Sequence, residues 1–176
     1  LSFQRIHLLY GENQGQINDF VENIFKKKFK NDVYHYDEEE IIKTEEIIFN
    51  HIQSKSFFDN NKLIIINRAT DKIKKIVEEI LQNEINDVNI VLISNVLEKK
   101  SKLRSFFEKE KKLVCIPFYR DTDQSLIYLI TDFCKEKKIN LSRQIINLII
   151  KRSMNDRQNL KNELSKIEAY SLSNKS

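Results

Sequence analysis

The chain has 176 residues, of which 40% are hydrophobic and 32% are charged. That balance is typical of a packed domain of ordinary size with a small second domain. The formal net charge of +4 is lower than that of most dedicated nucleic-acid-binding domains, so the composition does not demand such a partner. No apolar run reaches the roughly 18 residues that cross a bilayer, and Cys115 and Cys134 stand far apart. We therefore expect a soluble protein of the reducing cytoplasm, without a membrane partner.

The first part of the chain alternates short apolar runs with helical patterns. Apolar residues at helical spacing predict four helices, over about 14–29, 37–52, 70–81 and 101–110. In the first of them, Ile17, Phe20, Val21, Ile24 and Phe25 lie on one face. The apolar runs predict strands at 6–10, 33–36, 63–66, 90–93 and 113–116. Continuous apolar strands separated by helices indicate a parallel sheet that is covered on both faces. The predicted fold class is α/β, with a five-stranded parallel sheet in residues 1–119.

Residues 120–176 contain no strand pattern. Three helical segments are predicted there, at about 123–137, 142–154 and 156–172. The sequence therefore predicts a small three-helix domain after the α/β domain. Because Leu1 is not a methionine and Met154 is the single methionine, we also expect the chain to be a piece of a longer protein.

The turn after the first strand is where a nucleotide-binding protein of this layout holds phosphate. The motif is G-x-x-x-x-G-K-[ST], in which backbone amides and a lysine bind phosphate and a hydroxyl binds Mg²⁺. Here Gly11 begins the motif, but Gln16, Ile17 and Asn18 replace the second glycine, the lysine and the hydroxyl residue. The third strand ends at Asn67, where a metal-binding carboxylate is expected. The sequence predicts a degenerate site that binds neither nucleotide nor magnesium.

No other catalytic site is evident in the sequence. His7, His35 and His51 lack nearby cysteine or acidic ligands at metal-binding spacing, and we interpret them as partly buried structural residues. We expect no catalytic residue, no cofactor and no metal, and therefore no enzyme activity of this chain on its own.

The segment Ser56-Phe57-Phe58 precedes the third predicted strand. Neighbouring residues on a helix differ by about 100° in direction, so both phenylalanines cannot face one core and at least one is expected to be exposed. An exposed pair is suited to enter a partner's pocket, where a buried aromatic anchor contributes about 2–4 kcal/mol. A hydrophobic plug beneath the loop is the alternative interpretation.

Four short stretches, taken together, resemble one known family. They are Leu8-Leu9-Tyr10-Gly11-Glu12; Ser56-Phe57-Phe58 with Lys62-Leu63-Ile64-Ile65-Ile66-Asn67; Ser101-Lys102-Leu103-Arg104; and Asn162-Glu163-Leu164-Ser165-Lys166-Ile167 with Tyr170. With these stretches, the sequence resembles the delta subunit family of the bacterial DNA polymerase III clamp loader. Phe57 departs from the leucine that is usual in the family's Ser-Leu-Phe motif, which leaves the pair apolar but bulkier.

The resemblance implies an AAA+ module that has lost its nucleotide site, followed by a small helical domain. It also implies a third, collar domain, which we expect to be absent here. The implied partners are the sliding clamp (beta subunit), the clamp-loader ATPase and delta-prime subunits, and primed DNA through the assembled complex. Phe57 and Phe58 would enter the clamp's hydrophobic pocket and favour its open form, as part of the DNA polymerase III holoenzyme.

A basic stretch lies near the fourth of the predicted helices. Lys99, Lys100, Lys102 and Arg104 could lie near the DNA backbone, and a solvated surface is the alternative interpretation. Two other functions compete with the clamp-loader hypothesis. One is a divergent protein that binds nucleotide through an unusual loop. The other is a nucleic-acid-binding module, whose affinity would fall steeply with salt.

Overall fold

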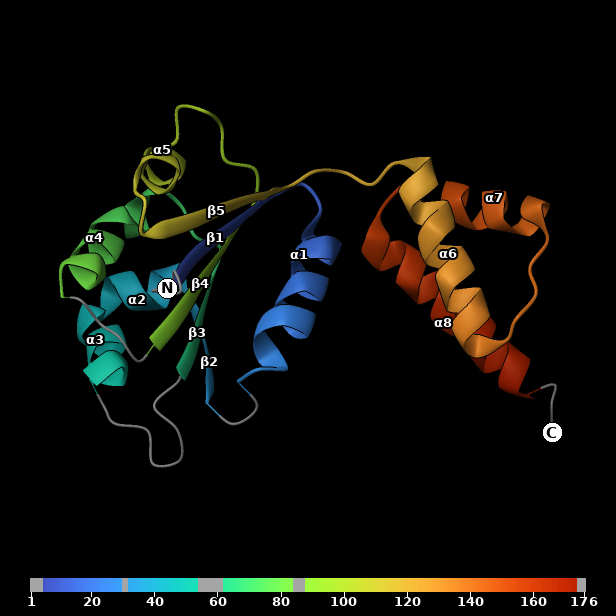
Figure 1. Cartoon of the computed structure of the whole chain (residues 1–176), viewed down its shortest axis with the longest axis horizontal. Helices are drawn as coiled ribbons and strands as arrows, with labels where there is room; N and C mark the ends of the chain where they lie inside the picture. The colour runs from blue at the N-terminus through green and yellow to red at the C-terminus, as the bar shows by residue number, and fades with distance from the viewer. Residues whose placement is uncertain (1–4, 30–31, 54–61, 84–87, 174–176) are drawn as a thin grey trace. The chain divides into compact units, whose positions relative to one another are not determined.

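The computed structural model describes residues 5–29, 32–53, 62–83 and 88–173 (Figure 1). Five strands form one parallel sheet in the order β2-β3-β4-β1-β5. In the register, Leu8 of β1 lies between Leu92 of β4 and Cys115 of β5. The predicted fold class is confirmed. The bounds of the strands are β1 (Ile6–Gly11), β2 (Val33–Asp37), β3 (Lys62–Asn67), β4 (Val88–Ser94) and β5 (Leu113–Phe118).

Helices cover both faces of this sheet, with α1 on one face and α2 to α5 on the other (Figure 1). This arrangement explains why β3 and β4 are apolar along most of their length, since side chains of both faces enter a core. The bounds of the helices are α1 (Gln14–Phe20), which continues as the π-helix η1 (Val21–Lys26), α2 (Glu38–Lys43), α3 (Glu45–Gln53), the 3-10 turn η2 (Asp71–Ile73), α4 (Lys74–Gln82) and α5 (Lys102–Lys109).

Two details of the predicted helices are wrong. Ile24 was expected on the buried face of the first helix, but 54% of it is exposed. The π-helical turn adds a residue to the helical period, so Val21 and Phe25 stay in the core while Ile24 turns outward. The helix expected over 37–52 is divided into α2 and α3, because Thr44 leaves the helical conformation at φ −142° and ψ 77°.

Helices α6 (Asp123–Lys137), α7 (Arg143–Ser153) and α8 (Arg157–Ser173) confirm the three predicted helices of the second part. Thr122 and Ser142 cap α6 and α7 by accepting hydrogen bonds from the backbone N–H groups of Ser125 and Ile145. One small core joins the three helices, formed by the buried side chains of Leu126, Ile130, Ile149, Ile150, Leu160 and Leu164.

The chain divides into two compact units. The sheet unit comprises Leu1–Glu12 and Ile17–Phe118, and the helical unit comprises Asn13–Gln16 and Tyr119–Ser176. The first turn of α1 therefore belongs to the helical unit, while the rest of α1 belongs to the sheet unit. Among the described helices, none combines the length and the apolar character that a membrane span requires.

Candidate functional site

Gly11 ends β1 in a conformation that other residues rarely adopt, with φ at +142°. A Cβ atom at this position would lie 2.1 Å from the carbonyl oxygen of Phe118 on the neighbouring strand. The backbone N–H of Gly11 donates to the carbonyl oxygen of Asn95 at 3.3 Å. Glycine is therefore required here by the packing of the strands, without reference to a bound phosphate.

The positions that replace the phosphate-binding residues do not point into a common site. Ile17, at the position of the lysine, is fully buried in the core with Val21 and Phe25. Asn18, at the position of the hydroxyl residue, is exposed. The side-chain oxygen of Gln16 lies 3.4 Å from the amide nitrogen of Asn13. The turn thus presents no cation at these positions, and its lysine position has become part of the core.

The end of β3, where a metal-binding acid was sought, is held by an amide. The side chain of Asn67 donates to the carbonyl oxygen of Tyr36 at 3.4 Å. Two carboxylates lie near this strand end. Asp37 is paired with Asn67 in the register and forms an ion pair with Arg68. Glu38 is 5% exposed and accepts from the N–H of Thr70 at 2.6 Å and from its hydroxyl at 2.8 Å. No local sequence pattern connects Glu38 with Thr70, because the two lie 32 residues apart along the chain.

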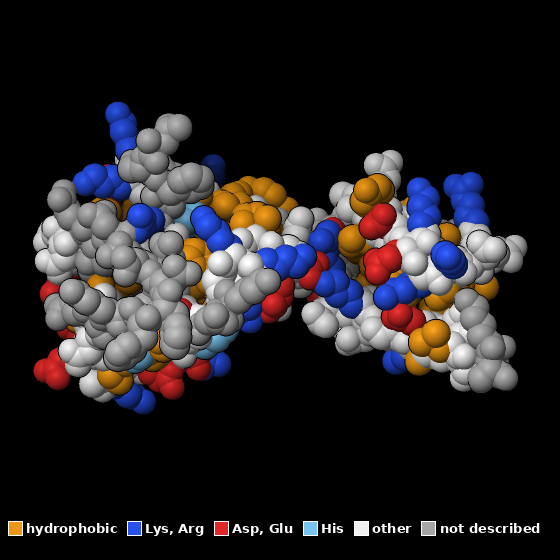
Figure 2. Space-filling view, turned by 60° about the horizontal axis from the view of Figure 1, so that its bottom comes forward, with side chains coloured by type: hydrophobic (Ala, Val, Ile, Leu, Met, Phe, Trp, Pro, Cys, Tyr) orange, Lys and Arg blue, Asp and Glu red, His pale blue; other side chains and the backbone are white. Residues whose placement is uncertain are grey.

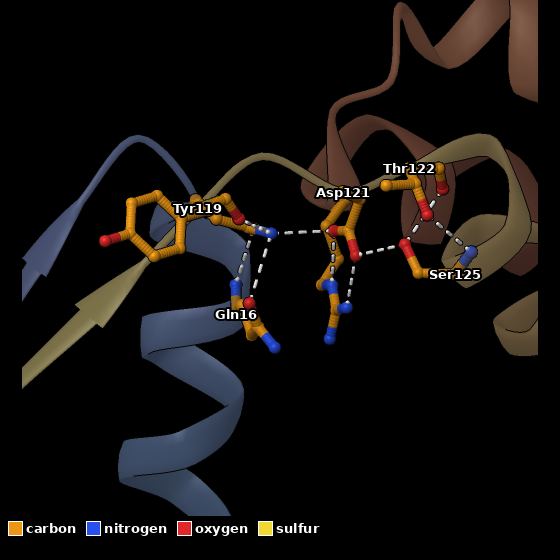
Figure 3. Close-up of polar contacts among 7 residues, drawn as sticks. Gln16, Tyr119, Asp121, Thr122 and Ser125 are labelled. Atoms are coloured by element: carbon orange, nitrogen blue, oxygen red, sulfur yellow. Dashed lines mark hydrogen bonds and ion pairs between the residues drawn. The ribbon is translucent and has the colours of Figure 1, made fainter.

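The first turn of α1 is fixed by the side chain of Asn13, which is 7% exposed (Figure 3). Its Oδ1 accepts from the backbone N–H of Gln16 at 3.0 Å, which caps the helix. Its Nδ2 donates to the carbonyl oxygen of Tyr119 at 3.1 Å and to Oδ2 of Asp121 at 2.7 Å. One amide side chain therefore joins the start of α1 to the segment that leads into α6.

The carboxylate of Asp121 accepts four hydrogen bonds. Arg157 donates two of them, from Nε at 2.8 Å and from Nη2 at 2.6 Å, and Ser125 donates a third from its hydroxyl at 2.7 Å. Asn13 donates the fourth (Figure 3). Asn13, Ser125 and Arg157 are called the donor cage below. The side chains of Asp121 and Arg157 are only 4% and 11% exposed.

The electrostatic balance in the donor cage favours the charged carboxylate. Burial alone would raise the pKa of Asp121, but the hydrogen bonds from Arg157, Ser125 and Asn13 lower it by more, so the pKa lies below its usual value. Sequence reasoning missed this cluster. Asn13 lies 108 residues before Asp121 and Arg157 lies 36 residues after it, and no motif connects them.

The basic stretch at the start of α5 is partly used within the fold. Ser101 caps the helix by accepting from the N–H of Arg104 at 3.2 Å. Arg104 donates to Glu108 at 2.8 Å and to the carbonyl oxygen of Leu97 at 3.0 Å, and its guanidinium lies 5.1 Å from the ring centre of Tyr10.

The lysines of this stretch differ from Arg104. Lys100 pairs with Glu98 at 2.8 Å on the surface, and Lys99 and Lys102 are exposed. The lysines are therefore accessible to a partner, whereas Arg104 is held by the fold.

Ser56, Phe57 and Phe58 lie outside the described residues. On one side of them, α3 ends at Gln53, and on the other, β3 begins at Lys62. Lys62 is 4% exposed and donates from Nζ to the carbonyl oxygen of His51 at 2.9 Å. This contact joins the two elements that flank the segment. The imidazole of His51 packs against the rings of Tyr34 and Tyr36, with ring centres 4.7 and 5.8 Å apart.

The side chains tested for catalysis do not converge. Within residues 5–29, 32–53, 62–83 and 88–173, no group of three or more His, Cys, Asp or Glu side chains has the arrangement of a metal site. His35 is exposed, contrary to the expectation that it is partly buried, because β2 is an edge strand. Burial raises the pKa of the Cys115 thiol to about 11, which makes it a poor nucleophile at neutral pH.

Solved structures share this fold at low sequence identity. The Bacillus subtilis DNA clamp loader delta protein (YqeN) matches with a TM-score of 0.59 and 12% identity, over 94% of this chain and 53% of that chain. Two variants of Thermotoga maritima RuvB match with TM-scores of 0.62 and 0.60 and 15% identity, over 97% of this chain and 56% of theirs. The chain thus spans about half the length of these proteins.

Comparison of the sequence itself favours the clamp loader delta protein over RuvB as the related family. No curated protein matches the sequence. A family model described as DNA polymerase III, delta subunit, matches residues 7–117, which is more than half of the chain and includes all but the two end residues of the sheet. The chain therefore belongs to the DNA polymerase III delta subunit family.

Proposed function

We propose that this chain is a clamp-loader subunit that binds the sliding clamp, favours its open form and does so without binding ATP. Membership in the delta subunit family carries the proposal. The full burial of Ile17 at the position of the phosphate-binding lysine supports the absence of nucleotide chemistry. Asn67 supports it independently, since an amide takes the place of the metal-binding acid.

The proposed contact with the clamp is the Ser56-Phe57-Phe58 segment. Two adjacent aromatic anchors that become buried in a pocket contribute about 2–4 kcal/mol each. The contact between Lys62 and His51 joins β3 to α3, the two elements that flank this segment.

Opening of the clamp would then be a consequence of differential affinity. A bound segment shifts the closed and open forms of the ring only by as much as it binds the open form more tightly. In this proposal, the ATPase subunits control access to Phe57 and Phe58, the delta-prime subunit completes the complex, and primed DNA enters the opened ring.

Surface plasmon resonance with immobilised sliding clamp from the same cell tests the contact. The double variant Phe57→Ala and Phe58→Ala should lower the affinity at least about 30-fold, which corresponds to about 2 kcal/mol. Tyr128→Ala is the matched control, since Tyr128 is an aromatic side chain that is 70% exposed on α6. Unchanged affinity in a double variant that keeps its far-UV circular dichroism spectrum would contradict the proposed contact.

Contact with DNA is proposed only for the lysines near α5. Lys99 and Lys102 are exposed and Lys100 carries a surface ion pair, whereas Arg104 is held by Glu108 and Leu97.

On the face of the helical unit that Figure 2 shows, Lys and Arg side chains alternate with Asp and Glu, which disfavours a continuous basic track there.

Two titrations distinguish the alternative functions. If the chain is a divergent nucleotide-binding protein, calorimetry with ATP and Mg²⁺ will give a saturable heat. If it is a nucleic-acid-binding module, its affinity for primed DNA in the absence of clamp will fall steeply with salt. The proposal predicts no saturable heat with ATP, and weak DNA binding that is reduced further when Lys99, Lys100 and Lys102 are replaced by alanine.

A further inference from the structure

The donor cage has the chemistry of an anion-binding site. A guanidinium, a hydroxyl and an amide N–H converge on one point, with donor–acceptor distances of 2.6–2.8 Å. These groups bind carboxylates and phosphates alike. Here the anion that they bind is supplied by the chain itself, as the side chain of Asp121, and all four of its acceptor positions are in use.

The donor cage also contacts the first turn of α1, within the helical unit. Asn13, one of its three members, caps α1 through the N–H of Gln16. At Gly15, in the first turn of α1, an added Cβ would lie 3.0 Å from Cβ of Arg157. The stem of Arg157 therefore packs directly on the backbone of the turn, and its guanidinium continues to Asp121.

We propose that the carboxylate of Asp121 serves as a built-in anion for the donor cage and holds the first turn of α1 in place without a bound nucleotide. Asn13–Gln16 belong to the same unit as Asp121, Ser125 and Arg157. The inference is independent of clamp binding, because it concerns only the helical unit and the turn after β1. It implies that this chain keeps the same local structure whether or not ATP is present.

Removing the built-in anion and replacing it from solution tests this proposal. Asp121→Ala in the full chain removes the carboxylate that accepts two hydrogen bonds from the buried Arg157, and the thermal unfolding midpoint should fall by about 10 °C. Sodium formate fits the space left by the carboxylate, so it should raise the midpoint of this variant relative to sodium chloride at equal ionic strength. The wild-type chain should show no such difference.

Asp123→Ala is the matched control, since Asp123 lies two residues after Asp121, at the first position of α6, and accepts an exposed hydrogen bond from Asn155. It should lower the midpoint by no more than about 2 °C and show no response to formate. An equal response of both variants to formate, or no response of Asp121→Ala, would overturn the proposal.

Hydrogen exchange tests the proposal even if the alanine variant does not fold. Asp121→Asn keeps the size of the side chain and removes its charge, and the amide of Gln16 should then exchange at least about tenfold faster than in the wild type. Addition of ATP and Mg²⁺ should leave exchange in the wild-type chain unchanged. Wild-type exchange rates in the Asn variant, or protection of Gln16 by ATP, would show that Asp121 does not hold this turn.

Discussion

Ile17 offers the sharpest test of the view that the nucleotide site has become part of the core. Its side chain is fully buried, whereas Ile24, seven residues later on the same helical stretch, is 54% exposed. Truncation of a buried isoleucine to alanine costs about 2–5 kcal/mol. Ile17→Ala should therefore lower the free energy of unfolding by about 3 kcal/mol, and Ile24→Ala by no more than about 0.5 kcal/mol.

Ile17→Lys restores the residue that a phosphate-binding turn requires, and the structure predicts that it will fail. The lysine would lose the apolar contacts of Ile17 and place an ammonium among Val21, Phe25 and Phe118. Its cost should reach about 5 kcal/mol. No nucleotide affinity should appear, because Asn67 supplies no carboxylate for a metal.

Urea unfolding at neutral pH measures these differences. Far-UV circular dichroism is the suitable signal, because the chain contains no tryptophan. The urea concentration at the midpoint, multiplied by the slope of the unfolding free energy against urea concentration, gives the free energy of unfolding of each variant in water. Equal costs for Ile17→Ala and Ile24→Ala, or a folded Ile17→Lys variant that binds ATP in calorimetry, would refute the reasoning.

Three further results are expected. Gly11→Ala should lower the free energy of unfolding by about 3 kcal/mol, because the new Cβ would lie 2.1 Å from the carbonyl oxygen of Phe118, as differential scanning calorimetry can show. Lys62→Met keeps the apolar stem but leaves the carbonyl oxygen of His51 without this donor, and should cost about 1 kcal/mol in urea unfolding. The lowered pKa of Asp121 means that its contribution is present above pH of about 4 and is lost as the pH falls through the folded-state pKa. Acid titrations followed by circular dichroism should therefore be flatter below pH 4 for Asp121→Asn than for the wild type.

The sheet was predictable because its central strands are buried on both faces. Ile64, Ile65 and Ile66 are all nearly inaccessible to solvent, and a short run of consecutive β-branched residues is typical of a strand inside a parallel sheet. The π-helical turn was not predictable, because Ile24 fits the period of an ordinary helix as well as its neighbours do. The turn shows only in the backbone hydrogen bonds, which side-chain periodicity does not report.

The sequence was sufficient to identify the departures from the phosphate-binding motif, but not the contacts of the donor cage. The substitutions at Gln16, Ile17 and Asn18 can be read from a motif of fixed spacing. Asp121, in the segment that leads into α6, and Arg157, at the start of α8, meet within the helical unit. Contacts between distant segments of this kind leave no local pattern in a single sequence.

The burial of Ile17 has a consequence for any attempt to build a nucleotide site of the usual kind into this chain. Because the position of the phosphate-binding lysine is filled by a core residue, a lysine there destabilises the fold before it can contribute to binding. A carboxylate at the position of Asn67 would be needed as well. Such a site therefore requires several coupled substitutions, and the one at residue 17 is costly by itself.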